Sequence, residues 1–282
     1  MEISKEGFKT AKGIDGSIRL LFDSSRAKEC CDFAIENNID IISLYPEVYT
    51  AKDLDPIYPI SKFIKGLLLD DKVNYGNLSL FYNLAFLSVP DNGNDTVDLS
   101  SFPKLKMLAC KYSQRLQGLE SCSNLKSLTV SNYKSKTKDL FDLPSLNNLE
   151  YLSLIKTEIT TLQGVERHSN LKKLEIFSAP KLETIAPLQA LSNSLEEIQI
   201  EQCKKINDYE ILGKVKSLKK IILSDSGEIK SLAFVKGLPR LEFISFWRTN
   251  VLDGNIKYCE GINYVGFDSR KHYTHKSEQF KK

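Results

Sequence analysis

The chain has 282 residues, of which 41% are hydrophobic and 27% charged. That composition supplies a sizeable core and excludes a disordered chain, and the length predicts one or two domains. The net charge is +3, but the last fourteen residues hold five basic side chains against Glu278 alone, so the rest of the chain carries about −1. A nearly neutral body gives no electrostatic reason to expect nucleic acid or an anionic membrane as partner.

The N-terminal stretch predicts no export signal. Its only apolar cluster is Ile18-Arg19-Leu20-Leu21-Phe22, which is too short and too charged for the core of a signal peptide. No apolar run in the chain approaches the ~18 residues of a membrane span. The six cysteines are scattered without a CxxC pair, so we expect reduced thiols in a cytoplasmic protein without zinc.

Residues 1–38 are predicted to form an N-terminal cap with one amphipathic helix. Ala27, Cys30 or Cys31, and Ala34 recur at helical spacing. Ser24 or Ser25 is the expected N-cap, and Asn37 and Asn38 mark the expected end of the helix.

From Ile39 onward one pattern repeats, with apolar residues at its first, fourth and sixth positions. The intervals between copies run from 20 to 25 residues. A short stretch that alternates between apolar and polar residues predicts a strand, and a fixed period predicts strands stacked in parallel, with positions four and six in the core. The eleven copies begin at Ile39, Ile64, Leu84, Leu105, Leu125, Leu149, Leu171, Leu195, Leu218, Leu241 and Ile262.

This pattern, L-x-x-L-x-L-x-x-(N/C/T)-x-L, resembles the leucine-rich repeat family. The copy "LEYLSLIKTEITTLQGV" at 149–165 is similar to the 22-residue class of bacterial internalin-type proteins. The resemblance implies an α/β solenoid, a horseshoe of about eleven repeats over residues 39–267. It implies a parallel sheet on the concave face and short 3₁₀, helical or extended convex segments.

The ninth position of the repeat departs from the family pattern, because it is mostly not asparagine. Small or polar side chains there can bond the backbone of neighbouring turns. This chain places Ser113, Thr157, Cys203, Ser226 and Thr249 at that position. Residues 268–282 are polar and basic and are expected to form a C-terminal cap or a loose tail.

Alternation along each strand points positions three, five and seven toward the concave face. In the later copies these positions collect aromatic residues beside charged ones, the usual composition of a protein-binding hot spot. An alternative is that the rings pack against each other and only stabilise the sheet. The predicted partner contacts are Tyr151, Lys173, Glu175, Phe177, Glu197, Glu201, Lys220, Phe243, Trp247 and Tyr264.

No catalytic or metal-binding pattern accompanies the repeats. His272 and His275 have HxxH spacing without a supporting acidic or cysteine cluster, and His168 lies in a turn. There is no Ser-His-Asp or Cys-His context and no glycine-rich phosphate loop. The sequence therefore predicts a protein that is not an enzyme and has no cofactor and no metal.

The expected partner is another protein, bound on the concave face by a monomer. Eleven strands at about 4.8 Å form an arc on the order of 50 Å, which suits a protein interface better than a small-molecule pocket. At the level of fold, the chain resembles compact bacterial leucine-rich repeat immunity proteins, which bind and occlude a toxin. The alternatives are a regulatory scaffold and an internalin-like surface protein. The latter needs export and an anchor, and we read neither here.

Overall fold

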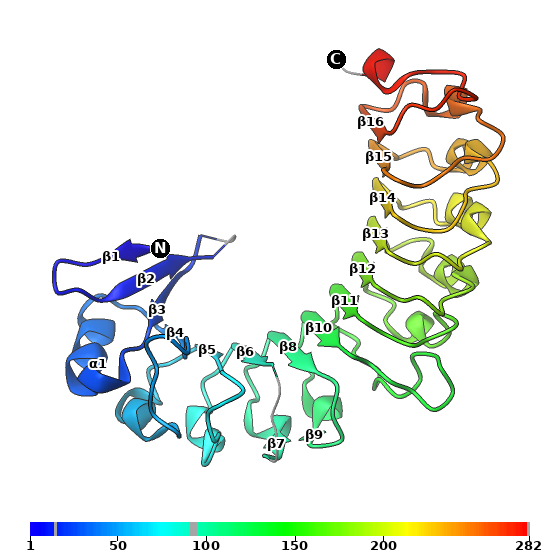
Figure 1. Ribbon diagram of the computed structural model, residues 1–282. Coiled ribbons are helices and arrows are strands. Elements are labelled where there is room, and N and C mark those ends of the chain that lie inside the picture. Colours follow the sequence, from blue (N-terminus) through cyan, green and yellow to red (C-terminus); the bar gives the residue numbers. More distant parts are fainter. Residues whose placement is uncertain (14–15, 91–94, 281–282) are drawn as a thin grey trace. The chain divides into compact units, whose positions relative to one another are not determined.

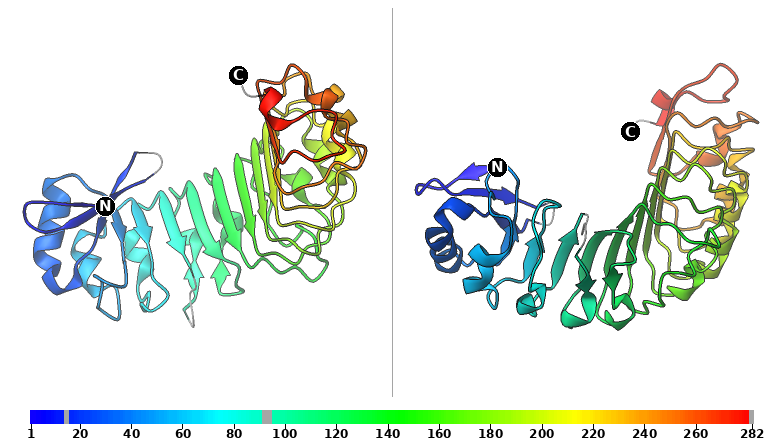
Figure 2. Two further views of the ribbon diagram at one scale, coloured as in Figure 1. Left: turned by 45° about the horizontal axis from the view of Figure 1, so that its top comes forward. Right: turned by 60° about the horizontal axis from the view of Figure 1, so that its bottom comes forward.

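A computed structural model describes residues 1–13, 16–90 and 95–280 (Figure 1). The chain forms two compact units, Met1–Leu128 and Thr129–Lys282. In both units each repeat places one strand in a sheet and returns through a short outer segment, mostly a 3₁₀ turn (Figures 1 and 2). The predicted leucine-rich repeat solenoid is confirmed. In each of the eleven predicted copies a strand begins at position three and covers positions three to five, and in most copies it extends one or two residues further.

The first unit contains an antiparallel beginning and then parallel strands. Strand β2 pairs antiparallel with both β1 and β3. From β3 the sheet continues with parallel strands in the order β3-β4-β5-β6-β8. Strands β7 and β9 pair with each other in a small separate sheet. Its elements are β1 (Glu2–Ile3), β2 (Lys9–Lys12), β3 (Ile18–Leu21), η1 (Ser24–Arg26), α1 (Ala27–Glu36), β4 (Ile41–Ser43), η2 (Asp55–Ile60), β5 (Gly66–Leu68), η3 (Leu78–Phe81), β6 (Phe86–Val89), β7 (Val97–Asp98), η4 (Leu99–Ser101), β8 (Met107–Lys111), β9 (Leu116–Gln117) and η5 (Leu119–Ser121).

Strand β3 is a further solenoid strand that the sequence pattern missed. Leu20 pairs in register with Ile42 of β4, so β3 occupies the place of a copy one repeat before Ile39. The first position of that copy falls on Ser17 instead of an apolar residue, which is why the pattern does not mark it. The Ile18–Phe22 cluster, which the sequence analysis considered only to reject a signal peptide, therefore supplies Leu20, Leu21 and Phe22 to the core.

The predicted N-terminal helix is confirmed as α1, with Cys30, Cys31 and Ala34 buried and Asn37 as its C-cap. The predicted N-cap is wrong. Asp23, not Ser24 or Ser25, caps the preceding 3₁₀ turn by accepting from the Ser25 backbone N–H at 3.0 Å, and α1 starts from Arg26 without a side-chain cap. An acidic side chain before the turn supplies the acceptor that the first N–H groups need.

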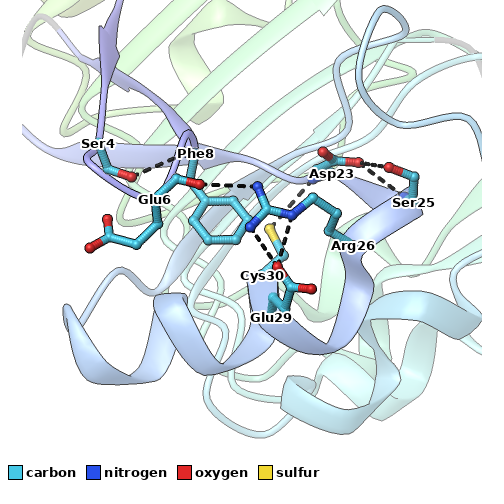
Figure 3. A network of polar contacts seen from close by, with 8 residues as sticks. All are labelled: Ser4, Glu6, Phe8, Asp23, Ser25, Arg26, Glu29 and Cys30. Atoms are coloured by element: carbon cyan, nitrogen blue, oxygen red, sulfur yellow. Dashed lines mark hydrogen bonds and ion pairs between the residues drawn. The ribbon is translucent and has the colours of Figure 1, made fainter.

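Arg26 ties the N-terminal hairpin to α1 (Figure 3). Its guanidinium lies 4.3 Å from the centroid of the Phe8 ring, donates from Nε to Glu29 at 2.8 Å and from Nη1 to the Glu6 carbonyl at 3.1 Å. Phe8 also packs against Phe33 of α1. The hairpin therefore covers the start of the core, as the end unit of a solenoid must.

The second unit consists of parallel strands and 3₁₀ turns. Strand β10 (Ser127–Ser131) straddles the boundary between the units, and β11 to β16 follow in chain order, each parallel to the next. The elements are β11 (Tyr151–Ile155), η6 (Val165–Arg167), β12 (Lys173–Phe177), η7 (Ala186–Leu191), β13 (Glu197–Glu201), η8 (Tyr209–Lys214), β14 (Lys220–Ser224), η9 (Leu232–Gly237), β15 (Phe243–Phe246), η10 (Ile256–Cys259), β16 (Tyr264–Phe267) and η11 (Ser277–Phe280).

Neighbouring strands pair the same repeat position with itself. Leu174 of β12, for example, lies opposite Leu152 of β11 and Ile198 of β13. These fourth-position side chains are at most 1% exposed, as are Leu154, Ile176 and Ile200 at position six. The register therefore places equivalent side chains of successive repeats next to each other and builds one continuous core under the strands of this unit.

The ninth-position side chains Thr157, Cys203, Ser226 and Thr249 contact the backbone of the preceding repeat, as predicted. Thr157 Oγ1 donates to the Tyr133 carbonyl at 3.0 Å, and Ser226 Oγ lies 3.3 Å from the Ile200 carbonyl. Thr249 Oγ1 lies 3.4 Å from the Leu223 carbonyl, and Cys203 Sγ makes a longer contact of 3.9 Å with the Ile176 carbonyl. Hydroxyl and thiol groups thus take the place of an asparagine ladder.

The chain leaves each of the strands β10 to β15 through a left-handed residue at the eighth position. This conformation favours glycine or asparagine, because the Cβ of other residues crowds the backbone. Of the six residues concerned, only Asn132 and, to a lesser degree, Asp225 are of types that adopt it readily. The six are Asn132, Lys156, Ser178, Gln202, Asp225 and Arg248, with φ between 48° and 58°.

We expect Lys156→Gly to raise the free energy of unfolding by about 0.5–1 kcal/mol relative to the wild type, because glycine relieves the left-handed strain at φ 55°. Urea unfolding monitored by circular dichroism measures this. Lys156→Ala is the matched control. It removes the same side chain but keeps a Cβ, and an equal gain in both variants would contradict the explanation by strain.

His168 is a buried titratable group of the second unit. It follows η6, is 1% exposed, and neither ring nitrogen has a hydrogen-bond partner among the described residues. Burial lowers the pKa of His168 below its usual 6.5, and the Leu146 backbone, close by but outside hydrogen-bond geometry, opposes this shift.

Because the folded form binds the His168 proton less readily than the unfolded form, stability should fall as the pH drops below about 6.5. We expect His168→Phe to reduce the loss of unfolding free energy between pH 7.5 and pH 5.0. Urea titrations of both proteins at both pH values give this difference. Equal losses would show that protonation of His168 does not limit stability.

Residues 268–280 pack on the last repeat. The Tyr273 hydroxyl accepts from the Val251 N–H at 2.9 Å, and the rings of Tyr273 and Phe280 lie 5.8 and 5.9 Å from that of Phe267. These contacts place Tyr273 and Phe280 against the last strand of the core. Lys281 and Lys282, the last two residues of the predicted segment 268–282, lie outside the described residues.

Candidate functional site

All ten predicted partner contacts lie on one sheet face of the second unit. The register aligns six of them in a single row at position three: Tyr151, Lys173, Glu197, Lys220, Phe243 and Tyr264. Glu175 is at position five, Phe177 and Glu201 pair at position seven, and Trp247 directly follows β15. These positions alternate with buried core residues, so the side chains point away from the core. We call these ten residues the aromatic–ionic face.

Glu175 is a largely buried charge of the face, with 13% of its side chain exposed. The Tyr151 hydroxyl donates to Glu175 Oε2 at 2.6 Å, and Lys173 Nζ lies 2.8 Å from Oε1. Burial raises the pKa of Tyr151 to about 12, and this hydrogen bond to a carboxylate is the second-largest cause of the rise. The hydroxyl therefore stays protonated at neutral pH and holds Glu175 in place.

The other two acids of the face differ in their partners. Glu197 Oε2 lies 3.8 Å from Lys173 Nζ and 3.9 Å from Lys220 Nζ, so it bridges two lysines of neighbouring strands. Glu201 accepts from Gln199 Nε2 at 2.7 Å, and no cation of the described residues lies within ion-pair distance of it. Glu201 is therefore the acid of this face that keeps an uncompensated charge.

Aromatic side chains of the face contact its lysines and each other, and two of the rings also remain exposed. Lys173 Nζ lies 5.5 Å from the Tyr151 ring centroid, Lys220 Nζ lies 5.3 Å from that of Phe243, and Phe243 stacks on Tyr264 at 4.3 Å and 9°. These contacts fit the alternative that rings stabilise the sheet. Trp247 and Tyr264, however, remain 41% and 45% exposed, so a partner can reach both.

A cavity of about 370 Å³ lies between these exposed rings at the last strand. Its lining includes Trp247, Tyr264, Gly266 and Phe280. A Cβ at Gly266 would lie 2.9 Å from Tyr264 Oη, so the glycine gives the Tyr264 ring room to lie along its own strand. The cavity has the size and the uncharged lining that suit a single large apolar side chain.

Sequence reasoning missed Gly266, Phe280 and Gln199 as parts of this site. Gly266 and Gln199 occupy outward positions of their strands, and only their neighbours Tyr264 and Glu201 give them a role. Phe280 was hidden in a segment interpreted as polar and basic. The apolar pair Tyr273 and Phe280 was the signal available there.

The fold is similar to those of several solved structures. Internalin C2 from Listeria monocytogenes has a TM-score of 0.53 and 18% identity, over 75% of this chain and 92% of that chain. A second Listeria monocytogenes internalin has a TM-score of 0.47 and 18% identity, over 82% and 78% of the two chains. The mouse RP105/MD-1 complex has a TM-score of 0.51 and 17% identity, over 82% of this chain and 40% of that chain.

The chain has the internalin-type leucine-rich repeat fold. Its sequence matches no family model and no curated protein. The chain spans less than half of the mouse chain to which it is similar. At identities this low, the likeness establishes the fold alone.

The histidines of the HxxH spacing are engaged by protein groups. His272 Nε2 lies 3.0 Å from the Val251 carbonyl, and His275 contacts the Thr274 hydroxyl at 2.9 Å and Glu260 at 3.1 Å. Within residues 1–13, 16–90 and 95–280 no group of three or more His, Cys, Asp or Glu side chains could hold a metal ion. No helix in this described part of the chain is both long and apolar enough to span a membrane.

All six cysteines of this leucine-rich repeat chain are buried and free of disulfides. Burial raises the pKa of every thiol, for example to about 12 for Cys110 and Cys259 and to about 11 for Cys203. A buried, protonated thiol is a poor nucleophile.

We expect Glu175→Gln to lower the free energy of unfolding by about 1–2 kcal/mol, because it weakens the bonds to Tyr151 and Lys173 at a largely buried position. Glu201→Gln is the matched control on the next strand, and we expect a change below about 0.5 kcal/mol. Urea unfolding of both variants measures the difference. Equal effects would show that Glu175 does not hold the face together.

Proposed function

We propose that this chain is a non-enzymatic, monomeric protein-binding module whose partner docks on the aromatic–ionic face. The observation that carries the proposal is the exposure of Trp247 and Tyr264 beside a cavity, at the end of a row of paired charges. Exposed aromatic anchors next to a pocket are the usual centre of a protein interface. The pocket offers a place for one protruding side chain of the partner.

The paired charges support this role because they are already ordered before a partner arrives. Lys173 and Lys220 are each held between an acid and an aromatic ring. A surface ordered in advance loses less conformational entropy on binding. Glu201, which has no such pairing, offers a site for a basic group of the partner and would favour one binding register.

The partner we propose is a protein and not a nucleic acid. Along position three, lysine and glutamate alternate from Lys173 to Lys220, whereas a phosphate backbone requires a continuous basic stripe. The buried thiols and the engaged histidines favour a role without catalysis, cofactor or metal. We further propose that the protein works in the cytoplasm.

The specific form we propose is a bacterial immunity-type protein that covers the active site of a toxin. Its support is the fold-level resemblance to compact leucine-rich repeat proteins with that role, together with a face suited to occlusion. A regulatory scaffold or an internalin-like interaction protein would use the same face. The identity of the bound protein separates these roles.

The test is affinity capture from the lysate of the source organism, using tagged wild type and Trp247→Ala. Each captured protein is then purified, and its Kd is measured by calorimetry. We expect one protein to bind the wild type and to bind Trp247→Ala about 30-fold more weakly, as for a hot spot of about 2 kcal/mol.

The matched control is Phe141→Ala, which removes a ring that is 45% exposed in the same unit but lies outside the aromatic–ionic face. It should bind like the wild type. If both variants bind equally well, the aromatic–ionic face is structural and the partner uses another surface. If the captured protein is a toxin, co-expression should protect cells, and loss of protection in Trp247→Ala would connect that activity to the face.

A further inference from the structure

Strand β16 ends the sheet of the second unit, and it pairs with one strand only. Among residues 1–13, 16–90 and 95–280, β15 is the single strand bonded to it. The segment that follows, residues 268–280, lies beyond the other edge of β16 (Figure 1), and its turn η11 contacts the strand. The edge of a sheet carries a row of backbone N–H and C=O groups, which need partners of their own.

The parallel register shows which groups of β16 face this edge. Tyr264 N–H, at position three, donates back to a carbonyl of the preceding repeat at 3.0 Å. Asp225 N–H, at an even position, donates forward to the Trp247 carbonyl of the next repeat, also at 3.0 Å. Successive residues of a parallel strand thus alternate between its two neighbours. Val265 and Phe267, at positions four and six, therefore direct their N–H and C=O groups to the edge.

The C-terminal segment covers these groups without pairing them. Val265 and Phe267 are 4% and 1% exposed, yet no hydrogen bond joins their backbone to the described residues 268–280. The group that η11 places against this strand is the apolar ring of Phe280, 5.9 Å from the Phe267 ring. Because buried backbone donors and acceptors are nearly always paired, this edge keeps unused hydrogen-bonding capacity.

Two cavities meet at the Phe280 ring along this strand. The cavity of about 370 Å³ beside Trp247 and Tyr264 also reaches Val265. A second cavity, of about 350 Å³, has Ile262, two residues before the strand, in its lining. Phe280 lines both. The turn η11 therefore fills the place of a next strand only in part.

Phe280 can leave this place at little cost to the fold. Its side chain is half-buried, and it belongs to a 3₁₀ turn of four residues outside the repeats. The backbone bond that joins η11 to the preceding chain runs from Ser277 N–H to the Ser269 hydroxyl at 2.9 Å. Movement of the ring therefore breaks no bond between repeats.

We propose that the edge of β16 accepts an extended segment of a partner protein, which adds a strand parallel to β16 and displaces the Phe280 ring. The backbone of the segment pairs the groups of Val265 and Phe267, and an apolar side chain beside Tyr264 enters the cavity. A row of unpaired backbone groups is complementary to another extended backbone and not to a helix, whose own groups are already paired. This inference rests on the proposed function, because the same partner uses the cavity, and it adds how that partner's backbone binds.

The probe is a fluorescein-labelled peptide with the sequence of residues 149–157, which contains the complete strand of one repeat. Two derivatives differ only in which backbone nitrogens are methylated. In a parallel strand added to β16, the nitrogens of Tyr151 and Ser153, at positions three and five, face β16. Those of Leu152 and Leu154 face away. Methylation of the first pair removes hydrogen bonds to β16, and methylation of the second pair is the matched control.

Fluorescence anisotropy measures the binding of both peptides to the full chain. We expect saturable micromolar binding of the peptide methylated at Leu152 and Leu154, and about tenfold weaker binding of the other peptide, which has lost two donors. Phe280→Ala should bind the first peptide about threefold more tightly, because no ring covers the edge. Phe141→Ala, which removes a ring that is 45% exposed elsewhere in this unit, should bind like the wild type.

Four results would overturn the proposal. Equal binding of the two methylated peptides would exclude backbone pairing, and no saturable binding would exclude the site. Unchanged or weaker binding by Phe280→Ala would show that the ring does not occupy the place of the added strand. A wild-type dimer in sedimentation that the peptide converts to monomer would give the edge to a second copy of this chain.

Failure of the proposed function is seen in a different measurement, the capture of a partner by Trp247→Ala. If Trp247→Ala loses the partner while both methylated peptides bind alike, the aromatic–ionic face binds without an added strand. That result would keep the proposed function and overturn this inference.

Discussion

The parallel register between equivalent positions of successive repeats is the constraint on which the structure depends. Each strand bonds the next with position three opposite position three and position four opposite position four, as Lys173 to Glu197 and Leu174 to Ile198 show. A slip by one residue would turn the leucines outward and the lysines inward. The same register therefore builds the core and arranges every outward side chain into rows.

Those rows explain why the two units carry different faces. Within Thr129–Lys282, lysine and glutamate of neighbouring strands neutralise each other and hold the rings of Tyr151 and Phe243. Within Met1–Leu128, the rows of Ile41 and Leu68 on β4, β5, β6 and β8 contain no charge. The same backbone arrangement thus carries a polar, aromatic face in one unit and an uncharged one in the other, and the difference lies in the outward residues.

The exits from the strands show how the fold tolerates an imperfect repeat. Hydroxyls and a thiol at position nine contact backbone carbonyls of the preceding repeat. Residues such as Lys156 and Arg248 accept a left-handed conformation that suits them poorly. Cooperative pairing on both sides fixes these turns, so local preference does not decide them.

The sequence by itself determined the solenoid, its period and the eleven strands, because apolar positions one, four and six recur wherever the core needs them. It also determined which residues share the aromatic–ionic face, since alternation and register follow from that period. Only the tertiary structure revealed β3, whose first position is Ser17, and the packing of Phe280 onto Phe267, because these ends break the repeat. It alone showed that Glu175 is buried and bonded while Glu201 keeps a free charge, because pairing depends on side-chain geometry across strands that no linear pattern contains.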